Sequence, residues 1–322
     1  MTAVTNDRAA RSGVPEHHRA GIRRRWNSAP YLFVAPAVAL FTFSIAIPIL
    51  YTGYLSLRTV KVSGLGLGPD DRKEVWSGLT NYGRTLTDHD FLTSVGRVLL
   101  YGLVVIPIML GLALLFALLL DSARARARRF SRVTIFMPYA VPAVISSLLW
   151  GFLYLPSVSP FHFAARSAGF ELAHPLDPDL VLFAIANIAV WGGTGFNMIV
   201  LYTSLRSIPS ELLEAARIDG CSEVQIAWRI KVPILTPSIV MTSIFALITT
   251  LQVFAEPMVL RPLTNTISTT WSPLMTIYRD AFIRNDIYSA SATSMVLALA
   301  TFVLSFGFLR LVQNRAFSQE NR

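Results

Sequence analysis

Six long runs of apolar residues, separated by polar segments, dominate the chain. An α-helix needs about 20 residues to cross a bilayer, and each run provides that length with no Asp, Glu, Lys, Arg or His between its ends. The pattern predicts an all-α integral membrane protein with six transmembrane helices. The predicted spans are Tyr31–Leu57, Val98–Leu120, Val133–Leu155, Leu180–Leu205, Pro233–Ala255 and Ile287–Leu309.

The first run could be mistaken for a signal peptide, because the basic residues Arg23–Arg25 precede it and Ala35–Ala37 resembles a cleavage site. The apolar run continues about twenty residues beyond that point, which is longer than the ~7–15 residues of a signal-peptide core. We therefore interpret it as a retained first helix. It is longer than a straight span requires, so tilting, a kink at Pro48 or an exposed extension is expected.

Lys and Arg are distributed unevenly between the connecting segments. With the N-terminus in the cytoplasm, eighteen of the 28 basic residues lie in inside segments and nine in outside loops, with Arg97 at the edge of the second span. Basic residues favour the cytoplasmic side, so both termini are predicted to be cytoplasmic. The predicted organisation is a basic tail over 1–29, a six-helix membrane domain over 30–311 and a cytoplasmic tail over 312–322.

The composition excludes several functional classes. Hydrophobic residues make up 53% of the chain and charged residues 15%, against about 25% charged residues in soluble domains. Membrane topology accounts for the net charge of +9, so no nucleic-acid partner is needed to explain it. The single cysteine, Cys221, cannot form an internal disulfide, and the five histidines lack the spacing of a metal site.

Catalytic and energy-coupling groups are missing from the predicted spans. Arg97 and Glu256 lie only at span boundaries, whereas proton- or ion-coupled carriers generally place a charged group within the membrane. A membrane hydrolase would need a nucleophile with a base, and the chain has no GxxxxGK[ST] motif for nucleotide phosphates. We therefore predict that the chain is not an enzyme, and that a partner supplies the energy for any driven transport.

The inside loop over residues 206–232 has helical signals of its own. Glu211–Ile218 has helix-forming composition with Ser210 as the predicted cap, and Asp219-Gly220 is a turn signal. Ser222 is predicted to cap a second short helix that runs to Arg229. Two short helices at the membrane surface would form a projection suited to a cleft on another protein.

This loop resembles the signature of the membrane subunits of binding-protein-dependent ABC importers. The signature is Glu-Ala-Ala, three residues, Gly, nine residues and Ile-x-Leu-Pro. The chain matches it at Glu214–Ala216, Gly220, Ile230 and Pro233, with Val232 in place of the leucine. The fixed gaps make the match specific.

Further segments resemble the maltose-type sugar permeases, in particular the first of the two paired subunits. These segments are Ala46–Leu57, Gly78-Leu79 with Asn81-Tyr82, Asp88 and Phe91, Phe136–Tyr139 and Leu148–Trp150. The resemblance covers nearly the whole chain after residue 30 and implies the six-helix bundle of a type I ABC importer permease. Val259–Thr270 departs from the family, which often has a Thr-Gly-Gly-Gly-Pro-like loop there.

The resemblance implies a subunit that works in a bacterial cell membrane with several partners. These are a second permease subunit in a heterodimer, two ATPase subunits that bind ATP and magnesium, and an extracytoplasmic solute-binding protein. The chain itself would hold no cofactor. The resemblance also makes the 206–232 loop the ATPase-coupling helix, in which Glu214 pairs with a basic residue of the ATPase. The coupling residues it implies are Glu214, Ala215, Ala216, Asp219 and Gly220.

Polar and aromatic residues in the fourth and fifth spans are candidates for the solute path. A polar solute needs hydrogen-bonding groups and aromatic faces near mid-depth, and in maltose-type permeases these two spans line the sugar path. The candidates are Trp191, Gly193, Phe196, Asn197, Thr250 and Gln252. Tyr139 and Trp150 of the third span are weaker candidates. Glycines and threonines are also common where membrane helices pack together, which is the alternative interpretation.

The expected function is therefore import of a sugar or oligosaccharide by ATP-driven alternating access. Two alternatives remain open. One is an ABC importer of another polar solute, such as a glycerophosphodiester, because the coupling signature is shared across importers. The other is a stand-alone secondary carrier, which the absence of charge within the spans disfavours.

Overall fold

The computed structural model describes residues 29–62, 72–122 and 126–316. Most of the predicted tails over 1–29 and 312–322 therefore lie outside the described residues. The chain divides into two compact units, with the boundary after Ile49.

The first apolar run is helical over its whole length. It comprises α1 (Ala29–Phe41), a π-helical turn η1 (Thr42–Ala46) and α2 (Ile47–Ser56). Pro48 has no N–H to donate to the carbonyl of Ser44, four residues earlier, and the π-helical turn lies at that level. The prediction of a helix over this run is confirmed up to Ser56, and the irregular turn precedes the predicted Pro48, which lies in α2.

A β-hairpin that the sequence pattern did not predict follows the first run. Strands β1 (Arg58–Val62) and β2 (Arg72–Trp76) pair antiparallel, with Arg58 opposite Trp76. Asn81 of the next helix, α3 (Thr80–Thr87), fixes the start of the hairpin by donating to the carbonyls of Ser56 (2.9 Å) and Arg58 (2.7 Å). The β-branched residues in β1 favour a strand.

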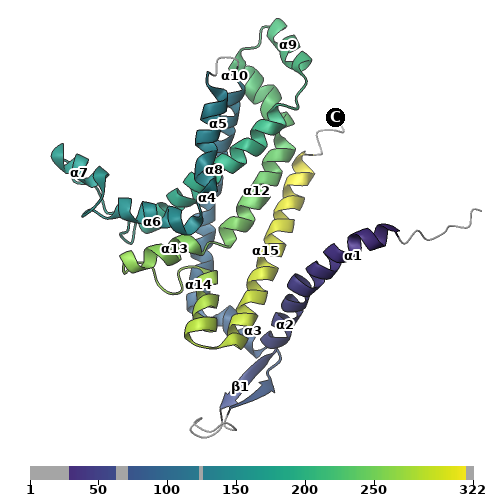
Figure 1. The fold of residues 1–322 in the computed structure, drawn as a ribbon, viewed down its shortest axis with the longest axis vertical. Helices are drawn as coiled ribbons and strands as arrows, with labels where there is room; N and C mark the ends of the chain where they lie inside the picture. The colour runs from purple at the N-terminus through teal and green to yellow at the C-terminus, as the bar shows by residue number, and fades with distance from the viewer. Residues whose placement is uncertain (1–28, 63–71, 123–125, 317–322) are drawn as a thin grey trace, which may run out of the picture. The chain divides into compact units, whose positions relative to one another are not determined.

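Three long helices form the centre of the main unit: α4 (His89–Asp121), α8 (Val181–Leu205) and α12 (Thr236–Leu251). They pack against one another (Figure 1). Small side chains such as Ala113 and Ala117, both fully buried, let α4 approach α8 closely. The second and fourth predicted spans are confirmed as helices, and α4 begins nine residues before the predicted Val98. Arg97 therefore lies within a helix and donates from Nη1 to the Trp271 carbonyl at 2.8 Å.

The prediction of one helix over Val133–Leu155 is wrong. The run is divided into α5 (Arg128–Phe136), a 3₁₀ turn η2 (Met137–Ala140) and α6 (Ala143–Tyr154), with a bend of 96° between the two halves. Pro142 explains the break, because a proline disfavours helical backbone in the preceding residue, and Val141 is extended (φ −82°, ψ 126°). Among the described residues, five helices are long and apolar enough to cross a membrane, or six if this bent pair counts as one span.

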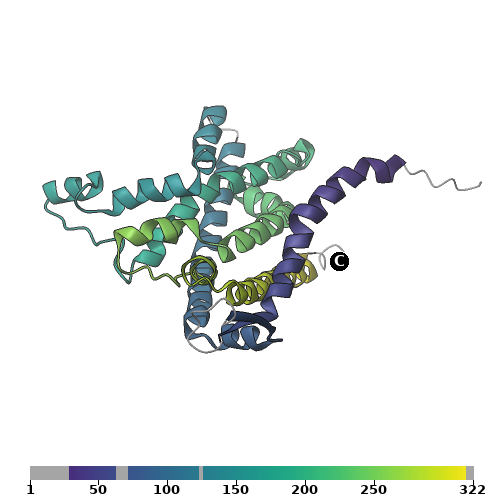
Figure 2. The ribbon, with the colours of Figure 1, turned by 60° about the horizontal axis from the view of Figure 1, so that its bottom comes forward.

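The fifth predicted run is also divided. Helix α12 ends at Leu251, residues 252–254 are not helical, and the chain continues as α13 (Ala255–Leu260) and a 3₁₀ turn η4 (Arg261–Leu263). An uninterrupted helix over Pro233–Ala255 was expected, and the interruption at residues 252–254 corrects that expectation. The stretch Thr236–Leu263 as a whole is still one of the five segments long and apolar enough to cross a membrane. Helices α6 and α13 lie side by side (Figures 1 and 2). Between α6 and α8 the chain forms a short helix, α7 (Pro160–Ser167).

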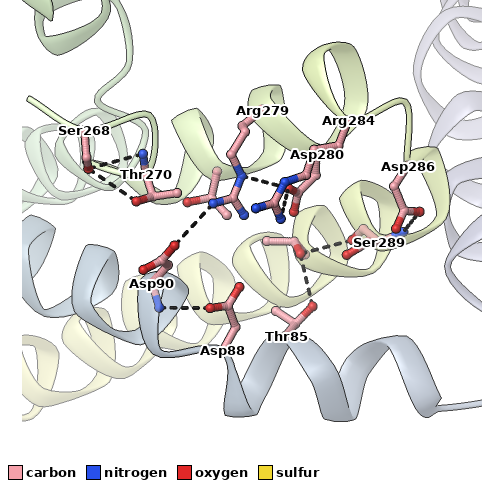
Figure 3. Close-up of polar contacts among 12 residues, drawn as sticks. Thr85, Asp88, Asp90, Ser268, Thr270, Arg279, Asp280, Arg284, Asp286 and Ser289 are labelled. Carbon is pink, nitrogen blue, oxygen red and sulfur yellow. Dashed lines mark hydrogen bonds and ion pairs between the residues drawn. The ribbon is translucent and has the colours of Figure 1, made fainter.

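The last part of the chain forms α14 (Pro273–Tyr278), a π-helical turn η5 (Arg279–Ile283) and α15 (Ile287–Ala316). The sixth predicted span is confirmed, since α15 contains it. A charged network anchors η5 to α4: the buried Arg279 contacts Asp280 at 2.9 Å and Asp90 at 3.4 Å, and Arg284 contacts Asp280 at 3.3 Å (Figure 3). This network and the hairpin lie at the end of the main unit opposite α9 (Ser210–Ile218) (Figure 1).

Candidate functional site

The 206–232 loop folds as two helices joined by a tight turn. Helix α9 (Ser210–Ile218) is followed by Asp219 and Gly220, and Gly220 has φ +81°, which favours glycine. The Cys221 N–H donates to the Ala216 carbonyl at 3.0 Å and closes the end of α9. The predicted helix–turn–helix arrangement is confirmed.

The predicted cap at Ser222 is confirmed, and the one at Ser210 is wrong. Helix α10 (Glu223–Ile226) begins with a reciprocal capping box: Ser222 Oγ accepts from the Gln225 N–H at 3.3 Å, and Gln225 Oε1 accepts from the Ser222 N–H at 2.7 Å. Ser210 is instead the first residue of α9, with Pro209 before it and no side-chain cap. The second helix also continues beyond Arg229, as a π-helical turn η3 (Ala227–Lys231) and α11 (Val232–Ile234).

An exposed ion pair joins the two helices across the turn. Arg217 Nε of α9 donates to Glu223 Oε1 of α10 at 2.9 Å. The hydrogen bond and the charge of Glu223 raise the pKa of the Arg217 guanidinium above its usual value. Since both side chains are about half exposed, the pair orients the helices but contributes little to stability.

The loop has a buried face and an exposed face. Ala216 and Ile226 are buried, and Leu213 packs against an apolar cluster that includes Leu205 and Leu235. Of the five residues that the resemblance implies for ATPase coupling, Ala216 is therefore buried, whereas Glu214, Ala215, Asp219 and Gly220 are exposed. Large apolar side chains share the exposed face with them: Leu212 (51% exposed), Ile218 (86%), Val224 (68%) and Trp228 (63%).

A cavity of about 700 Å³ lies between α4, α8 and the broken third and fifth runs. It contains five of the six solute-path candidates: Gly193, Phe196, Asn197, Thr250 and Gln252. The sixth, Trp191, does not line it. The Trp191 ring packs edge-on against Trp150, with their ring centroids 6.0 Å apart.

The two helix breaks shape the cavity. Tyr139 of η2 stacks on Phe196 of α8, with their centroids 4.9 Å apart and an interplanar angle of 21°. The non-helical residues after α12 bring Gln252 and Glu256 into the lining. Tyr101 of α4 also lines the cavity, and sequence reasoning missed it because α4 is apolar on all sides and has no periodic signal.

No basic side chain is among the described residues that line the cavity. Its polar groups are hydroxyls, amides and one carboxylate, that of Glu256. One of these polar groups already has a partner within α8, since Asn197 Nδ2 donates to the Gly193 carbonyl at 2.9 Å. Within the described ranges, no group of three or more His, Cys, Asp or Glu residues could hold a metal ion.

The fold, the helical loop and the polar cavity together define a membrane transport subunit. Residues 109–319 match the family described as binding-protein-dependent transport system inner membrane component, and the chain belongs to that family. It is therefore a permease subunit of an ABC importer and not an enzyme. This result removes the alternative of a stand-alone secondary carrier.

Proteins similar to this chain come from several bacteria. The chain is 27% identical to the sn-glycerol-3-phosphate transport system permease protein UgpA of Agrobacterium fabrum, over 89% of this chain and 95% of that protein. It is 31% identical to the osmoprotective compounds uptake permease protein GgtC of Synechocystis, over 69% and 78% of the two chains. Among solved structures, a bacterial ABC transporter involved in the import of alginate matches with a TM-score of 0.73 and 20% identity, over 89% and 95% of the chains. This last likeness supports the type I permease fold.

Proposed function

We propose that the subunit moves an uncharged sugar or oligosaccharide into the cell by alternating access. The observation that supports this most strongly is the lining of the cavity. The stacked Tyr139 and Phe196 rings offer faces for the C–H surface of a sugar, and Asn197 and Gln252 offer amide groups that serve hydroxyls as donor and acceptor. A volume of about 700 Å³ lies within the usual range for small-ligand pockets.

The charge of the cavity favours a neutral solute over a glycerophosphodiester. Sites for phosphate groups generally supply Arg or Lys, because a charge-assisted hydrogen bond compensates the desolvated anion. The residues that line this cavity supply neither, and they include the Glu256 carboxylate. The name of the Agrobacterium relative, which refers to sn-glycerol-3-phosphate, therefore does not by itself make that anion the preferred solute here.

The 206–232 loop is the proposed docking site for the ATPase subunits. Its exposed apolar residues Ile218, Val224 and Trp228 form a surface that a partner could bury. Glu214 is exposed beside them and available to a basic residue of the ATPase. In this proposal Gly220 maintains the angle between the two helices, while the partner subunits bind ATP and magnesium.

This docking site also determines the proposed orientation. The end that carries α9 faces the cytoplasm, together with the tails over 1–29 and 312–322, and the membrane domain spans 30–311. The opposite end, with the hairpin and the Arg279 network, faces the extracytoplasmic solute-binding protein. A second permease subunit completes the solute path as a heterodimer.

The experiment is uptake by the full complex reconstituted in proteoliposomes with its binding protein and ATP inside. Binding-protein ligands would first be identified by thermal shift among neutral saccharides and sn-glycerol 3-phosphate, since a ligand stabilises by mass action. We expect ATP-dependent uptake of a neutral saccharide that survives collapse of ion gradients. Transport of sn-glycerol 3-phosphate alone would overturn the proposed solute class.

Two variants test the solute path and the ATPase contact. Asn197→Leu should reduce saccharide uptake by up to about tenfold, the value of one lost hydrogen bond, whereas Thr203→Val on the exposed side of the same helix should not. Deletion of residues 211–223 should abolish co-purification of the ATPase while the subunit remains in the membrane. Retained assembly would contradict the proposed role of the loop.

A further inference from the structure

A buried ion pair connects the 206–232 loop to α4, the longest helix in the part of the chain that the structure describes. Lys231, the last residue of η3, places Nζ 2.5 Å from Oδ2 of Asp121, the last residue of α4. The two side chains are only 7% and 9% exposed. Lys231 occupies the position of the importer signature at which any residue is accepted, so the pair is a feature of this chain and not of the motif.

The surroundings leave the two charges dependent on each other. The end of α4 packs against an apolar cluster that includes Leu120, Leu205 and Leu235. The nearby Arg128 is directed elsewhere, since its Nη2 donates to the Ser122 carbonyl at 2.6 Å. Within the described ranges, neither Asp121 nor Lys231 forms a second ion pair, and the exposed Arg217 of α9 interacts with Asp121 only at longer range. Removing one partner would therefore leave an uncompensated buried charge.

Helix α4 extends from this pair to the cavity. Its residues Tyr101, Val105 and Met109 line the cavity. Met109 lies about 18 Å from Asp121 along the helix axis at 1.5 Å per residue, and Pro107, which lies inside α4, is not between them. The stretch from Asp121 to Met109 transmits a displacement at one end to the other. A movement of the loop that reaches Asp121 therefore reaches the cavity lining.

We propose that Asp121 and Lys231 are positioning residues that make α4 follow the coupling loop, so that movement driven by the ATPase changes access to the cavity. This inference rests on the proposed docking role of the loop. The alternative is that the pair only stabilises the fold. The two roles are separable, because replacing both charges together by apolar residues of similar volume removes the attraction without leaving a buried charge.

The test measures cavity access without any solute. A reporter cysteine, Ser146→Cys, is introduced in the cavity on a Cys221→Ser background, and the full complex is labelled with a membrane-impermeant methanethiosulfonate before and after trapping with ATP, magnesium and vanadate. With the pair intact, we expect trapping to change the labelling rate by about 5- to 150-fold, the usual range for coupled sites. With Asp121→Leu and Lys231→Met combined, we expect a change below about threefold at unaltered thermal stability.

Further variants make each outcome decisive. The charge exchange, Asp121→Lys with Lys231→Asp, should restore most of the trapping effect. Neutralising Arg166, an exposed residue of α7 outside the docking loop, by Arg166→Met should leave the trapping effect intact. An equal trapping effect in the doubly apolar variant overturns this inference alone. An absent effect with the pair intact, or a complex that contains no ATPase, overturns the proposed docking role and this inference with it.

Discussion

Gly195 provides the sharpest test of the packing around the broken third run. It lies in α8, where a Cβ atom would meet the Ile135 carbonyl oxygen at 2.2 Å and the Phe136 Cα at 2.7 Å. Both neighbours belong to the backbone at the junction of α5 and η2, so neither can rotate away. We therefore expect Gly195→Ala to destabilise the protein, although alanine is the better helix former.

The two opposing effects have different magnitudes. Replacing glycine by alanine within a helix stabilises the folded protein by about 0.5–1 kcal/mol. Overpacking of a tight contact costs about 1–3 kcal/mol, and more when the backbone must move. Relieving a 2.2 Å contact requires α5 and η2 to shift by about 1 Å to reach ordinary van der Waals separation. We expect a net loss of about 2 kcal/mol, which lowers the folded-to-unfolded ratio about 30-fold.

Two nearby glycines of the same helix are matched controls. A Cβ atom on Gly192 would meet no atom within 4 Å, so Gly192→Ala should be neutral or slightly stabilising. At Gly193 the Cβ would meet Met109 Sδ at 2.4 Å, and the flexible thioether can move aside, so an intermediate effect is expected. The assay is thermal unfolding of the detergent-purified subunit. Equal unfolding temperatures for Gly195→Ala and Gly192→Ala would refute the reasoning.

Two further predictions concern the loop and the opposite end of the bundle. Ser222→Ala removes the capping box and should destabilise the start of α10 by about 1 kcal/mol. The expected result is faster amide hydrogen exchange over residues 222–226. Unchanged exchange there would contradict this prediction. Asp280→Ala leaves the buried Arg279 with only the exposed Asp90 and should cost about 3 kcal/mol in thermal unfolding. Arg284→Ala, which removes a 59%-exposed partner, should cost less than about 1 kcal/mol; equal losses would show that burial does not determine the effect.

Local signals account for the features that the sequence predicted correctly. The fourth and sixth runs are uninterrupted and form α8 and α15, because hydropathy and length alone decide whether a segment can span a bilayer. The turn at Gly220 and the cap at Ser222 depend on residues within four positions of each other. The helices and turn of the 206–232 loop could therefore be located from spacing, without knowledge of their surroundings.

Other features depended on contacts between segments far apart in the chain. Hydropathy does not separate a straight span from a bent one, so the 96° bend over residues 128–154 was not predicted. The hairpin after the first run is anchored by Asn81, 23 and 25 residues away from the carbonyls it binds. The residue types of the solute-path candidates did not show which of them line the cavity, because that depends on how distant segments pack. Trp191, for example, packs against Trp150 and does not line the cavity.

The sequence by itself determined the class of protein, the main apolar helices and the position and local shape of the 206–232 loop, because these follow from length, hydropathy and short-range hydrogen bonding. Only the tertiary structure decided which side chains share the cavity and which charges are buried. Asp121 and Lys231 are 110 positions apart, and each by itself has the character of an ordinary charge at a membrane boundary. Packing of α4 against the loop excludes water from both, and that exclusion turns two surface-type residues into one buried pair.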